Sequence, residues 1–170
     1  MSNLPYLNGY PEELRAAAQG LLESGELEKR LSARYPERHG VHSNKELNAY
    51  VQELKALHMR KAAPLASVAY DNRLHVVHNA LGIHTTATRV QGGKLRKRRE
   101  MRVASMFKDL APEFLRMIVV HELAHMKHTD HDRDFYKLCT YMEPDYAQYE
   151  LDLRLQLTVR DWNAAQNPEQ

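Results

Sequence analysis

Several features that would assign this chain to a special class of protein are missing from its sequence. It has one cysteine in 170 residues, Cys139, so it cannot form an intrachain disulfide, which fits a reducing compartment. No apolar run reaches the roughly 20 residues that a membrane-spanning helix needs. Residues 1–6 contain neither the basic region nor the apolar region of a secretory signal. We therefore expect a cytoplasmic protein without a membrane segment.

The chain also has little excess of charge of either sign. The net charge is +2, which is too small to indicate nucleic acid as a partner by itself. Hydrophobic residues make up 43% of the sequence, as in an ordinary globular protein, and the length is enough for one sizeable core. We therefore expect a single domain over residues 1–170.

One stretch departs from this balance, a basic run made of Lys94, Arg96, Lys97, Arg98, Arg99 and Arg102. A solvated turn rich in positive charge is the simpler interpretation. The alternative is a contact for phosphate or for an acidic substrate, because clustered lysine and arginine side chains attract anions.

Hydrophobic spacing predicts an α+β fold with helices at both ends of the chain. Residues 1–62 have helical patterns: Pro11-Glu12-Glu13 is a helix start, Gly40 interrupts, and residues 43–46 form a capping box. Residues 63–163 are the expected core. Their first part contains short β-branched runs, which predict a small antiparallel or mixed sheet. The pair Gly92-Gly93 indicates a hairpin, and residues 101–107 are expected to form the last strand.

The helix expected to begin at Pro112-Glu113 is apolar nearly all round, so it should run through the core. Its polar residues His121, Glu122 and His125 are therefore unusual, because buried ionisable groups are costly unless they are paired or bound to a metal. On a helix, positions i and i+4 share one face about 6 Å apart along the axis, so two imidazoles can converge on one ion. Zinc at such a site lowers the pKa of a bound water, and the intervening Glu122 can act as general base. Further helices are expected over residues 132–142 and 145–163.

A catalytic zinc site needs a third protein ligand. His128 would lie about 10 Å along a continued helix from the first histidine of the motif, too far to share one ion. His131 has the better geometry if the helix ends near residues 126–130 and the chain turns back. Asp130 can tolerate the left-handed conformation that such a turn needs. The alternatives are Glu143 and Glu150. We favour His131.

The segment 119–136, which reads VVHELAHMKHTDHDRDFY, and the later MEPDY at 142–146 resemble the YgjP-like metal-dependent hydrolases. These are minimal zincins related to the SprT and WLM groups. The resemblance covers about residues 95–158 and leaves out the helical first 60 residues. It implies a minimal zincin-like fold in which His121, His125 and His131 bind Zn²⁺ and Glu122 is catalytic.

Three functions fit these residues. The first, which we favour, is a zinc metallopeptidase that acts on a peptide or protein. The second is a phosphohydrolase that acts on nucleotides with the same site, its phosphates bound by the basic run. The third is a non-enzymatic zincin-like scaffold that binds protein or nucleic acid, and an intact Glu122 argues against it because a purely structural zinc site needs no base. Support for an oxyanion is expected from one of four tyrosines: Tyr136, Tyr141, Tyr146 or Tyr149.

Overall fold

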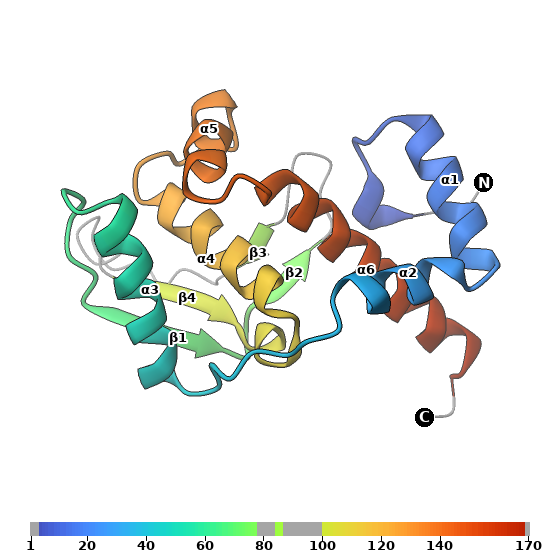
Figure 1. Ribbon diagram of the computed structural model, residues 1–170, viewed down its shortest axis with the longest axis horizontal. Helices are drawn as coiled ribbons and strands as arrows, with labels where there is room; N and C mark the ends of the chain where they lie inside the picture. Colours follow the sequence, from blue (N-terminus) through green and yellow to red (C-terminus); the bar gives the residue numbers. More distant parts are fainter. Residues whose placement is uncertain (1–3, 78–83, 87–99, 169–170) are drawn as a thin grey trace.

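The computed structural model describes residues 4–77, 84–86 and 100–168 of the chain (Figure 1). Within these residues the α-helices are α1 (Glu12–Glu23), α2 (Glu26–Arg34), α3 (Asn44–His58), α4 (Pro112–His125), α5 (Arg133–Met142) and α6 (Tyr146–Gln166). The strands are β1 (Ser67–Asp71), β2 (His75–Val77), β3 (His84–Thr86) and β4 (Glu100–Ala104), and two short 3-10 helices are η1 (Pro5–Leu7) and η2 (Ser105–Asp109).

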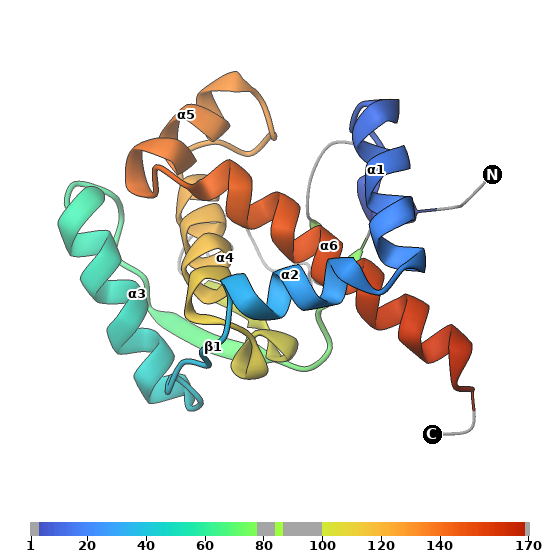
Figure 2. The same ribbon diagram turned by 45° about the vertical axis from the view of Figure 1, so that its right-hand side comes forward.

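Helix α4 occupies the centre of the molecule, as its all-round apolarity predicts. It begins with a proline at its first position, where the missing N–H is no loss. Helix α3 lies on one side of α4 and α6 on the other (Figure 2). Strands β1 and β4 run beneath it (Figure 1). Nine of its residues are buried: Phe114, Leu115, Met117, Ile118, Val119, Val120, His121, Leu123 and Ala124. A histidine is thus held inside the most apolar helix of the chain.

The described strands form two small pairs. Strands β1 and β4 pair in parallel, Ser67 opposite Glu100, and β2 pairs antiparallel with β3. The mixed α+β, minimal zincin-like fold is therefore confirmed. The expected strand over 101–107 is wrong in its second half, because β4 ends at Ala104 and η2 follows. The turn into η2 carries Phe107 into the core, where it is fully buried. The hairpin expected at Gly92-Gly93 lies outside the described residues.

The helical N-terminal part packs in two different places. The first piece, η1 with α1 and α2, lies along α6, whereas α3 packs against β1 and α4 (Figure 1). Gly25, with φ 76°, makes the left-handed turn between α1 and α2. Ser43 and Glu46 form the predicted capping box of α3. No helix in the described ranges combines the length and apolarity that crossing a lipid bilayer requires.

The C-terminal end of α2 is attached to α6 by polar bonds to a buried carboxylate. The Tyr35 hydroxyl donates to the Asp152 carboxylate at 2.5 Å, and Arg34 donates to the same carboxylate at 3.0 Å. Asp152 is 3% exposed. A buried carboxylate is costly unless its oxygens are paired, so these bonds fix the N-terminal helices on α6.

Candidate metal centre

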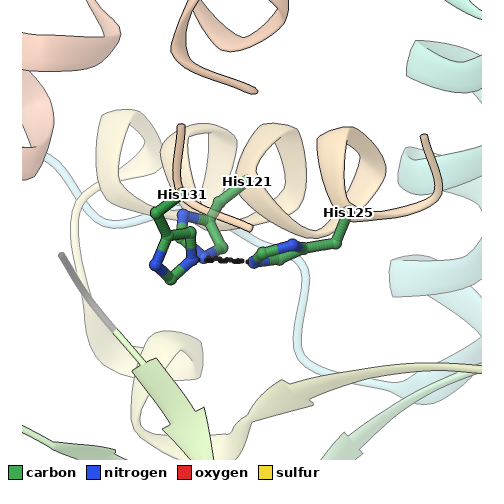
Figure 3. Close-up of side chains that lie close together, drawn as sticks. All are labelled: His121, His125 and His131. Carbon is green, nitrogen blue, oxygen red and sulfur yellow. Dashed lines mark hydrogen bonds between the residues drawn. The ribbon is translucent and has the colours of Figure 1, made fainter. Parts of the chain in front are cut away.

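Three histidine side chains meet beside α4, and Figure 3 shows their rings pointing toward one another. The Nε2 atom of His125 lies 3.1 Å from Nε2 of His121 and 2.9 Å from Nε2 of His131. The ligand nitrogens of all three lie within 4.8 Å of one another. Zinc–nitrogen bonds of about 2.0–2.1 Å in a tetrahedral arrangement hold neighbouring nitrogens about 3.3 Å apart. The three imidazoles therefore fit one metal ion, with a fourth position left for a substrate or water.

The third histidine reaches the pair because α4 ends directly after His125. The amide of Met126 bonds to the Leu123 carbonyl at 3.1 Å, a tightening of the last helical turn, and the chain then reverses before α5. The reversal was expected to need a left-handed conformation, which Asp130 can tolerate. That expectation is wrong, because none of the five residues between α4 and His131 has a positive φ.

In His121 and His125 the ring nitrogen that faces away from the triad is bonded as well. Nδ1 of His125 lies 3.0 Å from the backbone carbonyl of His128, and Nδ1 of His121 lies 2.8 Å from the Tyr146 hydroxyl. A carbonyl can only accept, so the His125 ring carries its proton on Nδ1 and presents the Nε2 lone pair to the triad. Metal-binding histidines in proteins are commonly oriented by such a bond at the second nitrogen.

The fully buried Phe135 forms a wall of the site, which the sequence reasoning missed. Its ring centroid lies 5.0 Å from that of His121, 4.6 Å from His125 and 4.9 Å from His131. Asp132 caps α5 by accepting a hydrogen bond of 2.9 Å from the Phe135 amide. This bond fixes the backbone position from which the Phe135 ring projects. The phenylalanine three residues after an N-cap aspartate was the available sequence signal.

The structure separates the other candidate ligands from the three histidines. Glu143 is buried and ion-paired with Arg116. Glu150 is buried and accepts a hydrogen bond of 3.2 Å from Arg154. Neither carboxylate belongs to the histidine cluster. His128 contributes its backbone carbonyl to the site, through the bond to His125. Among the described residues, the geometry thus favours His131 as third ligand.

Glu122 follows His121 directly on α4 and is half-buried. A glutamate next to the first of two ligand histidines lies where a general base is needed, within reach of solvent.

Two of the four tyrosines proposed for oxyanion support lie at the site. The Tyr136 ring centroid is 6.4 Å from that of His131, and Tyr146 contacts His121. Tyr141 is 67% exposed and packs on His58, and Tyr149 packs on Tyr35. Burial raises the pKa of the Tyr136 phenol, so its hydroxyl stays protonated at neutral pH and can donate.

Cys139 and the one described member of the basic run can also be placed. Cys139 is fully buried, and burial raises the pKa of its thiol to about 12, so no thiolate is available at neutral pH. Arg102 lies in β4 with its guanidinium 3.7 Å from Asp71 and 3.8 Å from Glu100. The other five members of the run lie outside the described residues.

An apolar core helix with HExxH, a third histidine after the turn and a half-buried glutamate define a metal-dependent hydrolase of minimal zincin type. The sequence profile described as "YgjP-like, metallopeptidase domain" matches residues 3–156. The chain therefore belongs to the YgjP-like family, as the resemblance predicted. The match is longer than expected, because it includes the helical N-terminal part.

One curated relative is a UTP pyrophosphatase of Escherichia coli (strain K12). The two chains are 51% identical over 158 residues, which is 93% of this chain and 95% of the relative. The alignment therefore spans nearly the full length of both proteins, including most of the helical N-terminal part of this chain. No solved structure matches the chain.

Proposed function

We propose that this protein is a zinc-dependent nucleoside triphosphate pyrophosphatase that acts on UTP or a similar nucleotide. The observation that carries the proposal is the 51% identity to a UTP pyrophosphatase over 95% of that relative. It favours the nucleotide alternative over the peptidase that the motif first suggests. The convergence of His121, His125 and His131 supports a metal site for this reaction.

In the proposed reaction, water attacks the α-phosphorus of the triphosphate. The bond from that phosphorus to its bridging oxygen breaks, and the products are a nucleoside monophosphate and pyrophosphate. Zinc, when held by the three histidines, would lower the pKa of water and polarise the phosphoanhydride. Glu122 takes the proton of the attacking water and can return it to the departing pyrophosphate. Tyr136, which keeps its proton, can donate a hydrogen bond to a phosphate oxygen near His131.

The first test is the reaction itself. Zinc-loaded protein should release pyrophosphate and UMP from UTP, and a strong chelator should abolish the release. The measurement is pyrophosphate formation with UTP, CTP, ATP and GTP compared in parallel. A Glu122-dependent cleavage of a peptide library, without turnover of any nucleotide, would contradict the proposal. That result would support a peptidase. A peptidase is the second candidate because the family is described as a metallopeptidase domain.

The second test concerns the basic run. Changing Arg96, Lys97, Arg98 and Arg99 together to glutamine should lower kcat/KM for UTP steeply, chiefly through a higher KM. Each charge-assisted bond to phosphate is worth about 1.5–3 kcal/mol, so even one lost contact costs roughly tenfold or more in affinity.

The matched control removes the same charge elsewhere, by changing the exposed residues Lys29, Arg30, Arg60 and Lys61 to glutamine. These residues lie on α2 and just after α3, so turnover of UTP should change little. An equal loss in both variants would mean that net charge alone steers the substrate. An unchanged KM in the first variant would exclude the basic run from phosphate binding.

A further inference from the structure

Helix α6 carries a buried polar row that ends at the candidate metal centre. Tyr146, Glu150 and Arg154 are spaced four residues apart, so they lie on one face of the helix. They are 1%, 6% and 2% exposed, respectively. Burying a carboxylate and a guanidinium costs free energy unless each is paired, so a row of this kind needs a physical reason.

Both ends of the row are bonded to other elements. The Tyr146 hydroxyl lies 2.8 Å from Nδ1 of His121, and Glu150 follows it one turn later on the same face of α6. Arg154 donates to the Glu150 carboxylate at 3.2 Å and to the backbone carbonyl of Tyr6, in η1, at 2.7 Å. The N-terminal segment thereby holds the far end of a polar row whose near end contacts a triad histidine.

The orientation of the His121 ring determines which of its nitrogens meets Tyr146 and which faces the triad. Its Nε2 faces Nε2 of His125 and its Nδ1 faces Tyr146. When Nε2 gives its lone pair to a metal, the ring proton must be on Nδ1, from which it is donated to the tyrosine oxygen. The tyrosine hydroxyl is then free to donate to Glu150, whose negative charge Arg154 balances.

We infer that Tyr146 is a positioning residue for His121, held by Glu150 and Arg154, and that it raises the affinity of the triad for a divalent metal. The inference rests on the proposed metal site and extends it to a tyrosine outside the ligand set. Carboxylates more often hold a ligand histidine directly, and here a tyrosine stands between the carboxylate and the ring. Loss of such outer partners typically weakens metal binding by about 10- to 100-fold.

The test compares two tyrosines with the same local chemistry. Tyr146→Phe removes only the hydroxyl that meets His121. Tyr35→Phe removes a buried hydroxyl that also donates to a carboxylate, Asp152, but lies between α2 and α6. Zinc affinity is measured by competition with a chromogenic chelator, and the stability of the metal-free proteins by thermal unfolding. We expect Tyr146→Phe to weaken zinc binding about 10- to 100-fold and Tyr35→Phe to leave it within about twofold of wild type.

Equal zinc affinities for wild type and Tyr146→Phe would overturn the inference, and so would equal losses in the two variants, which would indicate a general effect of stability. A double-mutant cycle gives an independent readout. If Glu150 acts through Tyr146, Glu150→Gln should weaken zinc binding in the wild type and have no added effect in Tyr146→Phe. Additive losses of zinc affinity in the double variant would mean that Glu150 does not act through Tyr146. Failure of wild type itself to bind zinc would instead remove the proposed metal site.

Discussion

Replacing Glu122 by glutamine should lower turnover of UTP by about 10²–10⁴-fold, the usual contribution of a general base, while zinc stays bound. Glutamine has nearly the same shape as glutamate but cannot accept a proton from water at neutral pH. The three histidines whose Nε2 atoms converge are unchanged by this substitution. The measurements are kcat/KM for UTP and the zinc content of the purified variant.

A matched control is available on the same helix. Glu113 lies in the first turn of α4, more than two turns from the motif, and Glu113→Gln makes the same chemical change. Turnover by that variant should stay near the wild-type value. A Glu122→Gln variant that keeps full activity would remove Glu122 from the reaction. Loss of zinc from this variant would mean that the carboxylate contributes to metal binding.

The elements predicted best from the sequence are those whose signal is local. Helix α4 follows from a proline start and an uninterrupted apolar run, and α3 from its capping box. The convergence of His121 and His125 follows from the geometry of one helical turn. His131 could be favoured as a third partner from spacing alone, since a short reversal after α4 was the only arrangement that brings it back.

The pairing of the strands could not be predicted in this way. β1 and β4 are separated by more than 25 residues and lie in parallel, with β2 and β3 between them in the chain. Alternation of apolar residues indicates that a strand exists but does not name its partner. The expected last strand was also too long, because Phe107 is placed in the core by η2 rather than by a continued strand.

The role of the first 60 residues was missed for a related reason. Their helices have ordinary apolar spacing, which predicts packing but no chemistry. Only the fold brings Tyr6 to Arg154 and Tyr35 to Asp152, partners more than 100 residues apart in the chain. Glu150 and Arg154 are oppositely charged and four residues apart, a spacing that predicts a pair on one face of α6 but not that the pair is buried. The family match begins at residue 3, so these N-terminal helices belong to the family's domain.

The second large effect is expected at the third histidine. His131→Ala should weaken zinc binding by orders of magnitude, more than the loss of an outer partner, because it removes one of three converging nitrogens. Its turnover of UTP at limiting zinc should fall in parallel. The measurement is the zinc dissociation constant by chelator competition, with unfolding of the metal-free variant to show that the fold is kept.

His128→Ala is the matched control, since it removes an imidazole only three residues earlier in the same loop. His128 serves the site through its backbone carbonyl, which accepts a hydrogen bond from Nδ1 of His125 at 3.0 Å. Alanine keeps that carbonyl, so zinc affinity should stay close to the wild-type value. If His128→Ala lost zinc and His131→Ala kept it, the arrangement of the loop between α4 and α5 would be wrong. If neither variant lost zinc, Glu143 or Glu150 would become the leading candidate for the third ligand. To bind the metal, that carboxylate would have to break its ion pair, with Arg116 for Glu143 or with Arg154 for Glu150.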